Sequence, residues 1–299
     1  MDPRYQHHPS PPLSPDEPSF FNIPNLSGFT AFHKVLLLGL ATLFIVINLS
    51  FFRLATILSP ENRKSTSQNR SAAITSHSAH LLIVLGSGGH TAEMLNILST
   101  SLPYLQAPFN FTHRTYVVSS GDSFSAQKAH RFESSLSDNM DSDPTTATTY
   151  DVVTVHRARK VHQSLLTAPV SSLRCLWDCI RILRGSHPDL QTTKSARGCP
   201  DLILTNGPGT GVVVIIASIV LLFFGLGGDS SDNDTQATPK GAAKTSQMRS
   251  IYIESWARVQ TLSLSGRLLK PLVSRFIVQW PQLVEKEGRR VEYIGPLVT

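Results

Sequence analysis

The stretch from His80 to Leu95 constrains the fold more than any other part of the chain. A mostly apolar segment, His80–Leu85, leads through Gly86-Ser-Gly-Gly-His90 into a helical pattern that starts near Thr91. Glycines at three of four positions let backbone N–H groups approach a ligand closely, and the helix N-terminus adds partial positive charge. The sequence therefore predicts a strand, a glycine turn and a helix that together can hold a phosphate or pyrophosphate group.

This turn departs from two common nucleotide-binding loops. A dinucleotide fingerprint needs a third glycine where Thr91 stands and an acid after the second strand, where the chain has Ser119 and Ser120. A P-loop needs a Gly-Lys-Ser/Thr sequence, which does not follow. These departures argue against an NAD(P)-dependent reductase, which remains an alternative. His90 begins the helix, where it can bind a phosphate, act as a base or cap the helix.

An apolar segment near the N-terminus predicts a membrane anchor. Residues 1–34 are rich in Pro, Ser and His and predict a disordered tail, whereas Val35–Leu58 is almost wholly apolar. A helix of that length reaches about 36 Å, enough to cross a hydrocarbon core of roughly 30 Å. A cleaved signal peptide is the alternative, but its apolar core is usually shorter and closer to the N-terminus.

Basic residues set the expected orientation of this anchor. Lys34 is the only basic residue close to its N-terminal side, and four lie at or beyond its other end, namely Arg53, Arg63, Lys64 and Arg70. The positive-inside rule then places the tail in the lumen and residues 59–299 in the cytosol. Glycans on any of three sequons in that part would contradict this orientation: Asn69, Asn110 and Asn233.

Beyond a polar linker at 59–79, strand and helix patterns alternate through residues 80–299. Repeated units of this kind predict an α/β fold, a Rossmann-like doubly wound parallel sheet with the strand order 3-2-1-4-5-6. Two low-complexity stretches, 137–150 and 227–249, read as loop insertions. The predicted strands are His80–Leu85, Arg114–Ser119, Asp151–Val155, Asp201–Thr205, Ser250–Glu254 and Arg275–Gln279.

A second glycine-rich turn follows the fourth predicted strand. It reads Asn206-Gly-Pro-Gly-Thr-Gly211, and the predicted order puts the first and fourth strands side by side, so that both turns meet at one crevice. Asn206 and Thr210 can meet a ligand there, or serve a tight turn in which Thr210 caps the next helix. That helix, Val212–Leu226, is apolar on all sides and short for a membrane span, which favours a core helix that can also touch the membrane.

Two further polar residues are expected on the same rim, and one helix shows an apolar stripe. Glu254 can orient a sugar hydroxyl and Arg258 can contact phosphate, or the two can form an ion pair within the domain. Between the third and fourth strands, five apolar residues spaced 4, 3, 4 and 3 apart share one face of an amphipathic helix: Leu166, Val170, Leu173, Trp177 and Ile180.

Charge and cysteine content exclude some classes of function. The net charge of +6 suits an anionic membrane surface or a phosphorylated ligand. No basic run interleaves with aromatic residues, which argues against nucleic acid as a partner. The three cysteines lack C-x-x-C spacing, and the acid pairs Asp141/Asp143 and Asp232/Asp234 lie in low-complexity loops. We therefore expect no metal and no cofactor.

The motifs together resemble one family. They are GSGGHTAEM, YVVSSGDSFSAQKA, DLILTNGPGTG, YIESWARVQTLSLSG and FIVQWPQL. This combination closely resembles the membrane-anchoring subunit of the two-subunit UDP-N-acetylglucosamine transferase of the dolichol pathway, the asparagine-linked glycosylation protein 14 family. The resemblance covers roughly residues 80–299, apart from the loops.

The resemblance implies a function that is divided between two chains. This chain would be the N-terminal, acceptor-side half of a GT-B glycosyltransferase. A small cytosolic subunit would supply the donor-binding catalytic half. Together they would add the second GlcNAc to GlcNAc-pyrophosphate-dolichol, the N-glycan precursor, on the cytosolic face of the endoplasmic reticulum membrane or of the nuclear membrane. Few residues follow the sixth strand, so a second α/β domain is not expected within this chain.

The resemblance also implies site residues. The acceptor pyrophosphate would lie against Gly86, Ser87, Gly88, Gly89, His90, Thr91, Asn206, Gly207, Gly209, Thr210, Glu254 and Arg258, with His90 as a catalytic candidate. The partner subunit would dock on the C-terminal segment, at Val291, Tyr293, Ile294, Gly295, Pro296, Leu297 and Val298. A stretch near 189–200 looks like an insertion. A membrane tether without ligand contact is the other alternative.

Overall fold

The computed structural model describes residues 30–59, 79–109, 111–139, 149–158, 163, 168–191, 199–207, 209–227, 248–295 and 297. Its internal contacts divide the chain into two units, residues 1–51 and 52–299. The expectations for the tail, for the linker, for most of both loop insertions and for most of 189–200 lie outside the described residues.

The first helix is long and apolar enough to span a membrane. It is α1 (Ala31–Leu58), and its segment His33–Leu58 has a mean hydropathy of 2.5 with none of its most apolar part buried. It contains the whole predicted segment Val35–Leu58. Among the described residues, it is the one helix that meets this criterion.

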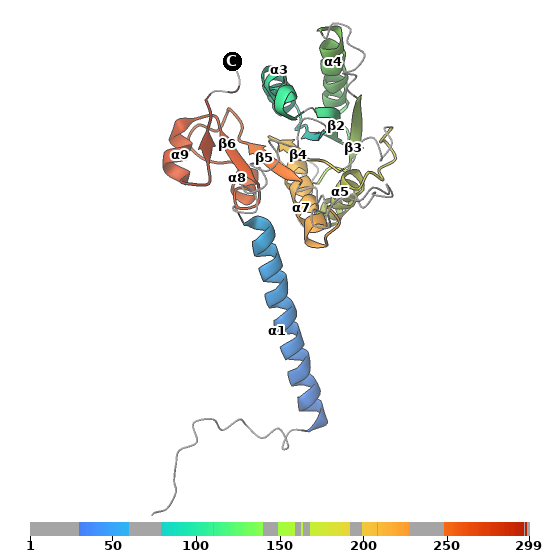
Figure 1. Ribbon diagram of the computed structural model, residues 1–299, viewed down its shortest axis with the longest axis vertical. Coiled ribbons are helices and arrows are strands. Elements are labelled where there is room, and N and C mark those ends of the chain that lie inside the picture. Colours follow the sequence, from blue (N-terminus) through green and yellow to red (C-terminus); the bar gives the residue numbers. More distant parts are fainter. Residues whose placement is uncertain are drawn as a thin grey trace, which may run out of the picture. The chain divides into compact units, whose positions relative to one another are not determined.

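A parallel sheet of seven strands forms the centre of the second unit (Figure 1). Its order is β3-β2-β1-β4-β5-β6-β7, which confirms the predicted doubly wound order and extends it by one strand. β7 was not predicted because it has only two residues. The strands are β1 (Ala79–Val84), β2 (Phe111–Ser119), β3 (Thr149–Val155), β4 (Leu202–Thr205), β5 (Arg249–Ile253), β6 (Arg275–Val278) and β7 (Glu292–Tyr293).

Helices cover both faces of this sheet (Figure 1). Alternate side chains of a strand point to opposite faces, so β1 supplies Leu81 and Ile83 to one apolar cluster and Leu82 and Val84 to the other. The first cluster includes residues of α3 (Gly89–Phe109) and α4 (Ser123–Asn139). The second includes residues of α5 (Ala168–Leu183), α7 (Thr210–Phe223), α8 (Leu264–Leu269) and α9 (Pro281–Glu287).

The apolar stripe predicted on α5 is not the face that packs against the sheet. Val170, Leu173 and Trp177 are exposed, Ile180 is partly buried, and Leu166 lies outside the described residues. Asp178 is buried because it accepts hydrogen bonds from the backbone N–H and ring of His156, at 2.9 and 2.6 Å. The buried face of α5 consists of Cys175, Asp178, Cys179, Ile182 and Leu183. Hydrophobic spacing does not reveal this face because it includes an acid and two cysteines.

Candidate functional site

The two glycine turns lie against each other at the carboxyl ends of β1 and β4. Val84 pairs with Thr205 in the sheet, so the turns begin side by side. A Cβ on Gly207 would lie 3.0 Å from the Cα of Gly86, and one on Gly86 would lie 2.7 Å from the Cβ of His90. Only glycine allows this approach, which occurs where the strand order reverses and open α/β sheets bind ligands.

The tip of the first turn is open to solvent. Ser87, Gly88 and Gly89 are exposed, and a Cβ on Gly88 would meet no atom within 4 Å. Gly88 has φ +64°, a left-handed conformation that favours glycine. Gly89 begins α3, and α7 begins at Thr210 beyond the second turn, so two helix N-termini point to this end of the sheet. The arrangement suits an anion.

The hydroxyl groups of two threonines among the expected site residues make hydrogen bonds within the protein. The Thr91 hydroxyl donates to the carbonyl of Gly86 and lies 2.7 Å from the Ser125 hydroxyl. The Thr210 hydroxyl lies 2.7 Å from that of Ser119. Thr210 does not cap α7, because Gly209 occupies the N-cap position and Thr210 is the first helical residue. Both hydroxyls therefore fix the turns in place.

A pocket of about 880 Å³ opens beside the first turn, within the size range of small-molecule sites. It joins the start of α3 to the second turn, the end of β5 and the region before α8. The residues that line it are Gly89, His90, Ala92, Glu93, Asn96, Asn206, Tyr252, Glu254, Ser255, Trp256, Ala257, Arg258, Ser263 and Ser265.

Asn206 joins the second turn to the first helix. Its side-chain N–H donates to the backbone carbonyl of His90 at 2.9 Å, and the residue is buried. The opposite amide orientation would place two acceptor oxygens face to face, so this contact fixes the side chain. Asn206 therefore holds His90 at the pocket wall, where the imidazole remains partly exposed.

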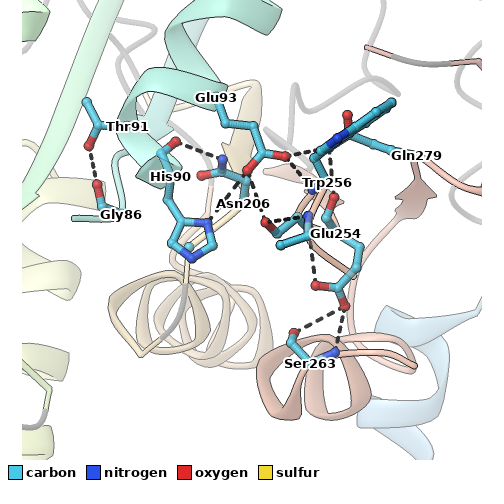
Figure 2. A network of polar contacts seen from close by, with 12 residues as sticks. Gly86, His90, Thr91, Glu93, Asn206, Glu254, Trp256, Ser263 and Gln279 are labelled. Carbon is cyan, nitrogen blue, oxygen red and sulfur yellow. Dashed lines mark hydrogen bonds and ion pairs between the residues drawn. The ribbon is translucent and has the colours of Figure 1, made fainter. Parts of the chain in front are cut away.

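Glu93 is the central residue of the pocket's polar network, and sequence reasoning gave it no role (Figure 2). Its carboxylate accepts hydrogen bonds from the backbone N–H of Trp256 at 2.7 Å and the Ser255 hydroxyl at 3.2 Å. Gln279 also donates to it, and the ring Nδ1 of His90 lies 3.7 Å away. The hydrogen-bond donors stand 162 to 186 residues further along the chain, so no local pattern reveals them.

The environment of Glu93 favours its ionised form. Burial alone would raise its pKa, but contacts from His90, the Trp256 N–H, Gln279 and Ser255 outweigh that effect, and the pKa lies below its usual value of 4.5. The unfolded state therefore binds a proton more readily than the folded state. Glu93 contributes stability above its unfolded pKa and loses it as the pH falls through its folded pKa.

Replacing Glu93 by Gln is expected to lower the free energy of unfolding by about 2 kcal/mol at neutral pH, because hydrogen bonds to a charged acceptor are lost. The gap between wild type and variant should stay constant above about pH 5 and narrow below the usual glutamate pKa of 4.5. Thermal unfolding across pH 3 to 8 measures this gap, with the exposed Glu285→Gln as a control. A gap that persists unchanged at pH 3 would contradict the assignment.

The carboxylate of Glu254 is bound within the fold. It accepts hydrogen bonds from the N–H and hydroxyl of Ser263 at 3.0 and 3.1 Å, and from the N–H of Ser255 at 3.1 Å. A Cβ on Gly266 would collide with it, so this close approach requires glycine. Arg258 is exposed on the pocket lining and does not pair with Glu254 in any described contact. Arg258 therefore offers the pocket a cation, while Glu254 shapes its wall.

The expected partner-docking segment has mixed exposure. Val291 is buried in the core, and Leu297 packs against the other apolar cluster. Tyr293 and Ile294 are exposed at and beside the edge strand β7, and Gly295 follows with φ +100°. Pro296 and Val298 lie outside the described residues. Among the described members of this set, Tyr293 and Ile294 are thus the exposed apolar side chains that a second chain can reach.

Fold and site together define a class of protein. The chain is a Rossmann-like α/β protein with an N-terminal helix that can span a membrane and a glycine-walled crevice at the point where the strand order reverses. Across the described residues, no three His, Cys, Asp or Glu side chains converge to hold a metal ion.

The family described as "Oligosaccharide biosynthesis protein Alg14 like" matches residues 81–297. The chain therefore belongs to the Alg14 family. This match covers every strand of the sheet but the first two residues of β1, and it contains both glycine turns.

Relatives from fungi and mammals are similar to about two thirds or more of the chain. A protein of Aspergillus fumigatus named "UDP-N-acetylglucosamine transferase subunit alg14" is 44% identical over 219 residues, which cover 64% of this chain and 95% of the relative. The Schizosaccharomyces pombe protein of that name is 36% identical, covering 72% of this chain and 82% of its own length. The Homo sapiens protein is 35% identical, covering 74% and 84%.

Proposed function

We propose that this chain is the membrane-anchoring, acceptor-binding and recruitment subunit of a UDP-N-acetylglucosamine transferase. The complex would add the second GlcNAc to GlcNAc-pyrophosphate-dolichol during synthesis of the N-glycan precursor. Family membership and the names of the relatives support the transferase role. The observation that carries the acceptor role is the contact between the two glycine turns, which creates one crevice with two helix N-termini beside it.

The acceptor pyrophosphate would lie on the exposed turn Ser87–Gly89. Backbone N–H groups at the start of α3 would donate to its oxygens, and Arg258 would add a cation from the opposite wall. His90 would face the same ligand, either polarising it or accepting a proton from the acceptor hydroxyl. Asn206, Glu93 and the internally bound Glu254 would keep these groups in position.

The donor sugar nucleotide would bind a separate cytosolic subunit. This chain would then form the acceptor-side half of a GT-B enzyme, with Tyr293 and Ile294 in the docking surface. Helix α1 would cross the endoplasmic reticulum membrane and leave residues 59–299 in the cytosol, as the basic residues at and beyond the end of the helix favour. Fixing acceptor and partner at one surface raises their effective concentration.

Co-purification followed by a transfer assay tests this division of labour. We expect the chain and its partner to co-purify from detergent, and GlcNAc transfer to require both, with less than about one hundredth of the activity for either alone. The readout is transfer of labelled GlcNAc from UDP-GlcNAc to a GlcNAc-pyrophosphoryl lipid. Full turnover by the purified chain without a partner would overturn the proposal.

A further inference from the structure

One large aromatic side chain on the pocket wall has no role in the function proposed above. Trp256 follows β5, lines the pocket and is 37% exposed. On one side it packs against the partly buried ring of Trp280, with ring centroids 4.5 Å apart and planes inclined by 42°. Burial of a large aromatic ring contributes more free energy than burial of a smaller apolar side chain. The accessible part of this indole is therefore suited to contact a ligand in the pocket.

The backbone N–H and the backbone carbonyl of Trp256 are both hydrogen-bonded within the fold. The N–H of Trp256 donates to Glu93 at 2.7 Å (Figure 2). The carbonyl of Trp256 accepts from the indole N–H of Trp280 at 2.7 Å. Glu93 is itself bound by Gln279 at the end of β6. The residue therefore needs little ordering when a ligand arrives, which reduces the entropy lost on binding.

The chemistry of the pocket changes from one side to the other. Gly89 and His90 at the start of α3 suit an anion, whereas Trp256 offers the electron-rich face of an indole. The C–H groups on one face of a pyranose ring carry slight positive charge and pack well on such a surface. A ligand that joins a phosphate group to a pyranose can satisfy both sides, and a bare pyrophosphate can satisfy only one.

We propose that Trp256 is a specificity-determining residue that stacks on the sugar ring of the acceptor, so that the site selects a sugar pyrophosphate over pyrophosphate alone. This inference rests on the proposed acceptor role and adds the residue that recognises the sugar. Trp280 and Glu93 act as positioning residues, because they bind the backbone carbonyl and N–H of Trp256.

The first experiment measures kinetics of the assembled complex with Trp256→Ala and Trp256→Phe. The Ala variant should raise the KM for a short-chain GlcNAc-pyrophosphoryl lipid about five- to tenfold, while the KM for UDP-GlcNAc stays unchanged. The Phe variant should recover most of that loss because it keeps an aromatic face. Trp177→Ala is the matched control, since Trp177 is also an exposed indole but lies on α5, outside the pocket lining.

The second experiment does not depend on turnover. Calorimetry on the full chain compares soluble GlcNAc diphosphate with inorganic pyrophosphate. Wild type should bind the sugar-bearing ligand more tightly, and Trp256→Ala should remove that advantage while leaving pyrophosphate binding unchanged. If the wild-type complex transfers no GlcNAc, the proposed function fails. The difference in affinity between GlcNAc diphosphate and pyrophosphate still decides whether Trp256 recognises a sugar.

Two results would overturn the inference. One is an unchanged acceptor KM together with an unchanged preference for the sugar-bearing ligand in Trp256→Ala. The other is loss of the partner subunit on co-purification of that variant with ligand preference intact, which would assign Trp256 to the subunit interface instead. A melting temperature within about 2 °C of wild type excludes a general loss of folding as the cause.

Discussion

Replacing Gly88 by Asp will abolish GlcNAc transfer by the assembled complex, with an expected loss of at least about 100-fold in kcat/KM for the acceptor. The new carboxylate would stand on the exposed turn where the acceptor pyrophosphate is proposed to bind, and like charges repel. A Cβ at this position meets no atom within 4 Å, so the side chain fits without a clash. The measurement is the transfer assay together with co-purification of the partner.

Two matched variants separate charge from backbone strain in this prediction. Gly88→Asn has the shape of Asp without its charge and tolerates φ +64° comparatively well, so it should retain much more activity. Gly288→Asp places the same carboxylate at another open glycine with φ +76°, at the C-cap of α9, and should leave transfer unchanged. An active Gly88→Asp complex with its partner still bound would instead support a tether without ligand contact.

The site's backbone could be predicted from sequence because its signals are local. A strand pattern followed by Gly86–His90, and another followed by Asn206–Gly211, gave two turns, and the doubly wound order placed them together. Each step depends on residue type over a few positions and on the handedness of parallel crossovers. The close approach of Gly86 and Gly207 then follows from two adjacent strands that end together.

The side-chain network could not be predicted, because its partners are distant in sequence. Glu93 became central only when β5 and β6 brought Trp256 and Gln279 beside α3. Glu254 looked free to bind a ligand, since nothing local showed that Ser263 would occupy its carboxylate. Hydrophobic spacing likewise predicted the wrong buried face of α5. An aspartate is normally expected on the exposed face, but Asp178 is buried because it accepts hydrogen bonds from His156.

Replacing Glu133 by Ala is expected to lower the free energy of unfolding by about 3–5 kcal/mol, because the carboxylate belongs to a buried ion pair. Its carboxylate accepts two hydrogen bonds from Arg114 at 2.6 Å each and one from the hydroxyl of Tyr116 at 2.5 Å. Both members of the ion pair are about 2% exposed. Glu133→Ala would remove the carboxylate that binds the buried guanidinium of Arg114 through two hydrogen bonds.

The Glu133 charge shifts the pKa values of both Arg114 and Tyr116. Burial alone would lower the pKa of Arg114, but the hydrogen bonds and charge of Glu133 outweigh it and raise that pKa. Burial, followed by the Glu133 charge, raises the pKa of the Tyr116 hydroxyl well above its usual value. Arg114 therefore stays charged and Tyr116 neutral across physiological pH, and the Glu133 carboxylate accepts hydrogen bonds from both.

A double replacement distinguishes the cost of removing one member of the buried pair from the value of the pair itself. Arg114→Met combined with Glu133→Leu fills similar volume without charge, so it should recover most of the stability lost in Glu133→Ala. The exposed pair Arg275–Glu292 is the control, and Glu292→Ala there should cost less than about 1 kcal/mol. Chemical unfolding of the four proteins measures these differences. Equal losses in Glu133→Ala and in the double variant would contradict this prediction. The buried pair itself, rather than the removal of one member opposite a buried charge, would then account for the stability, because an apolar pair fails to replace it.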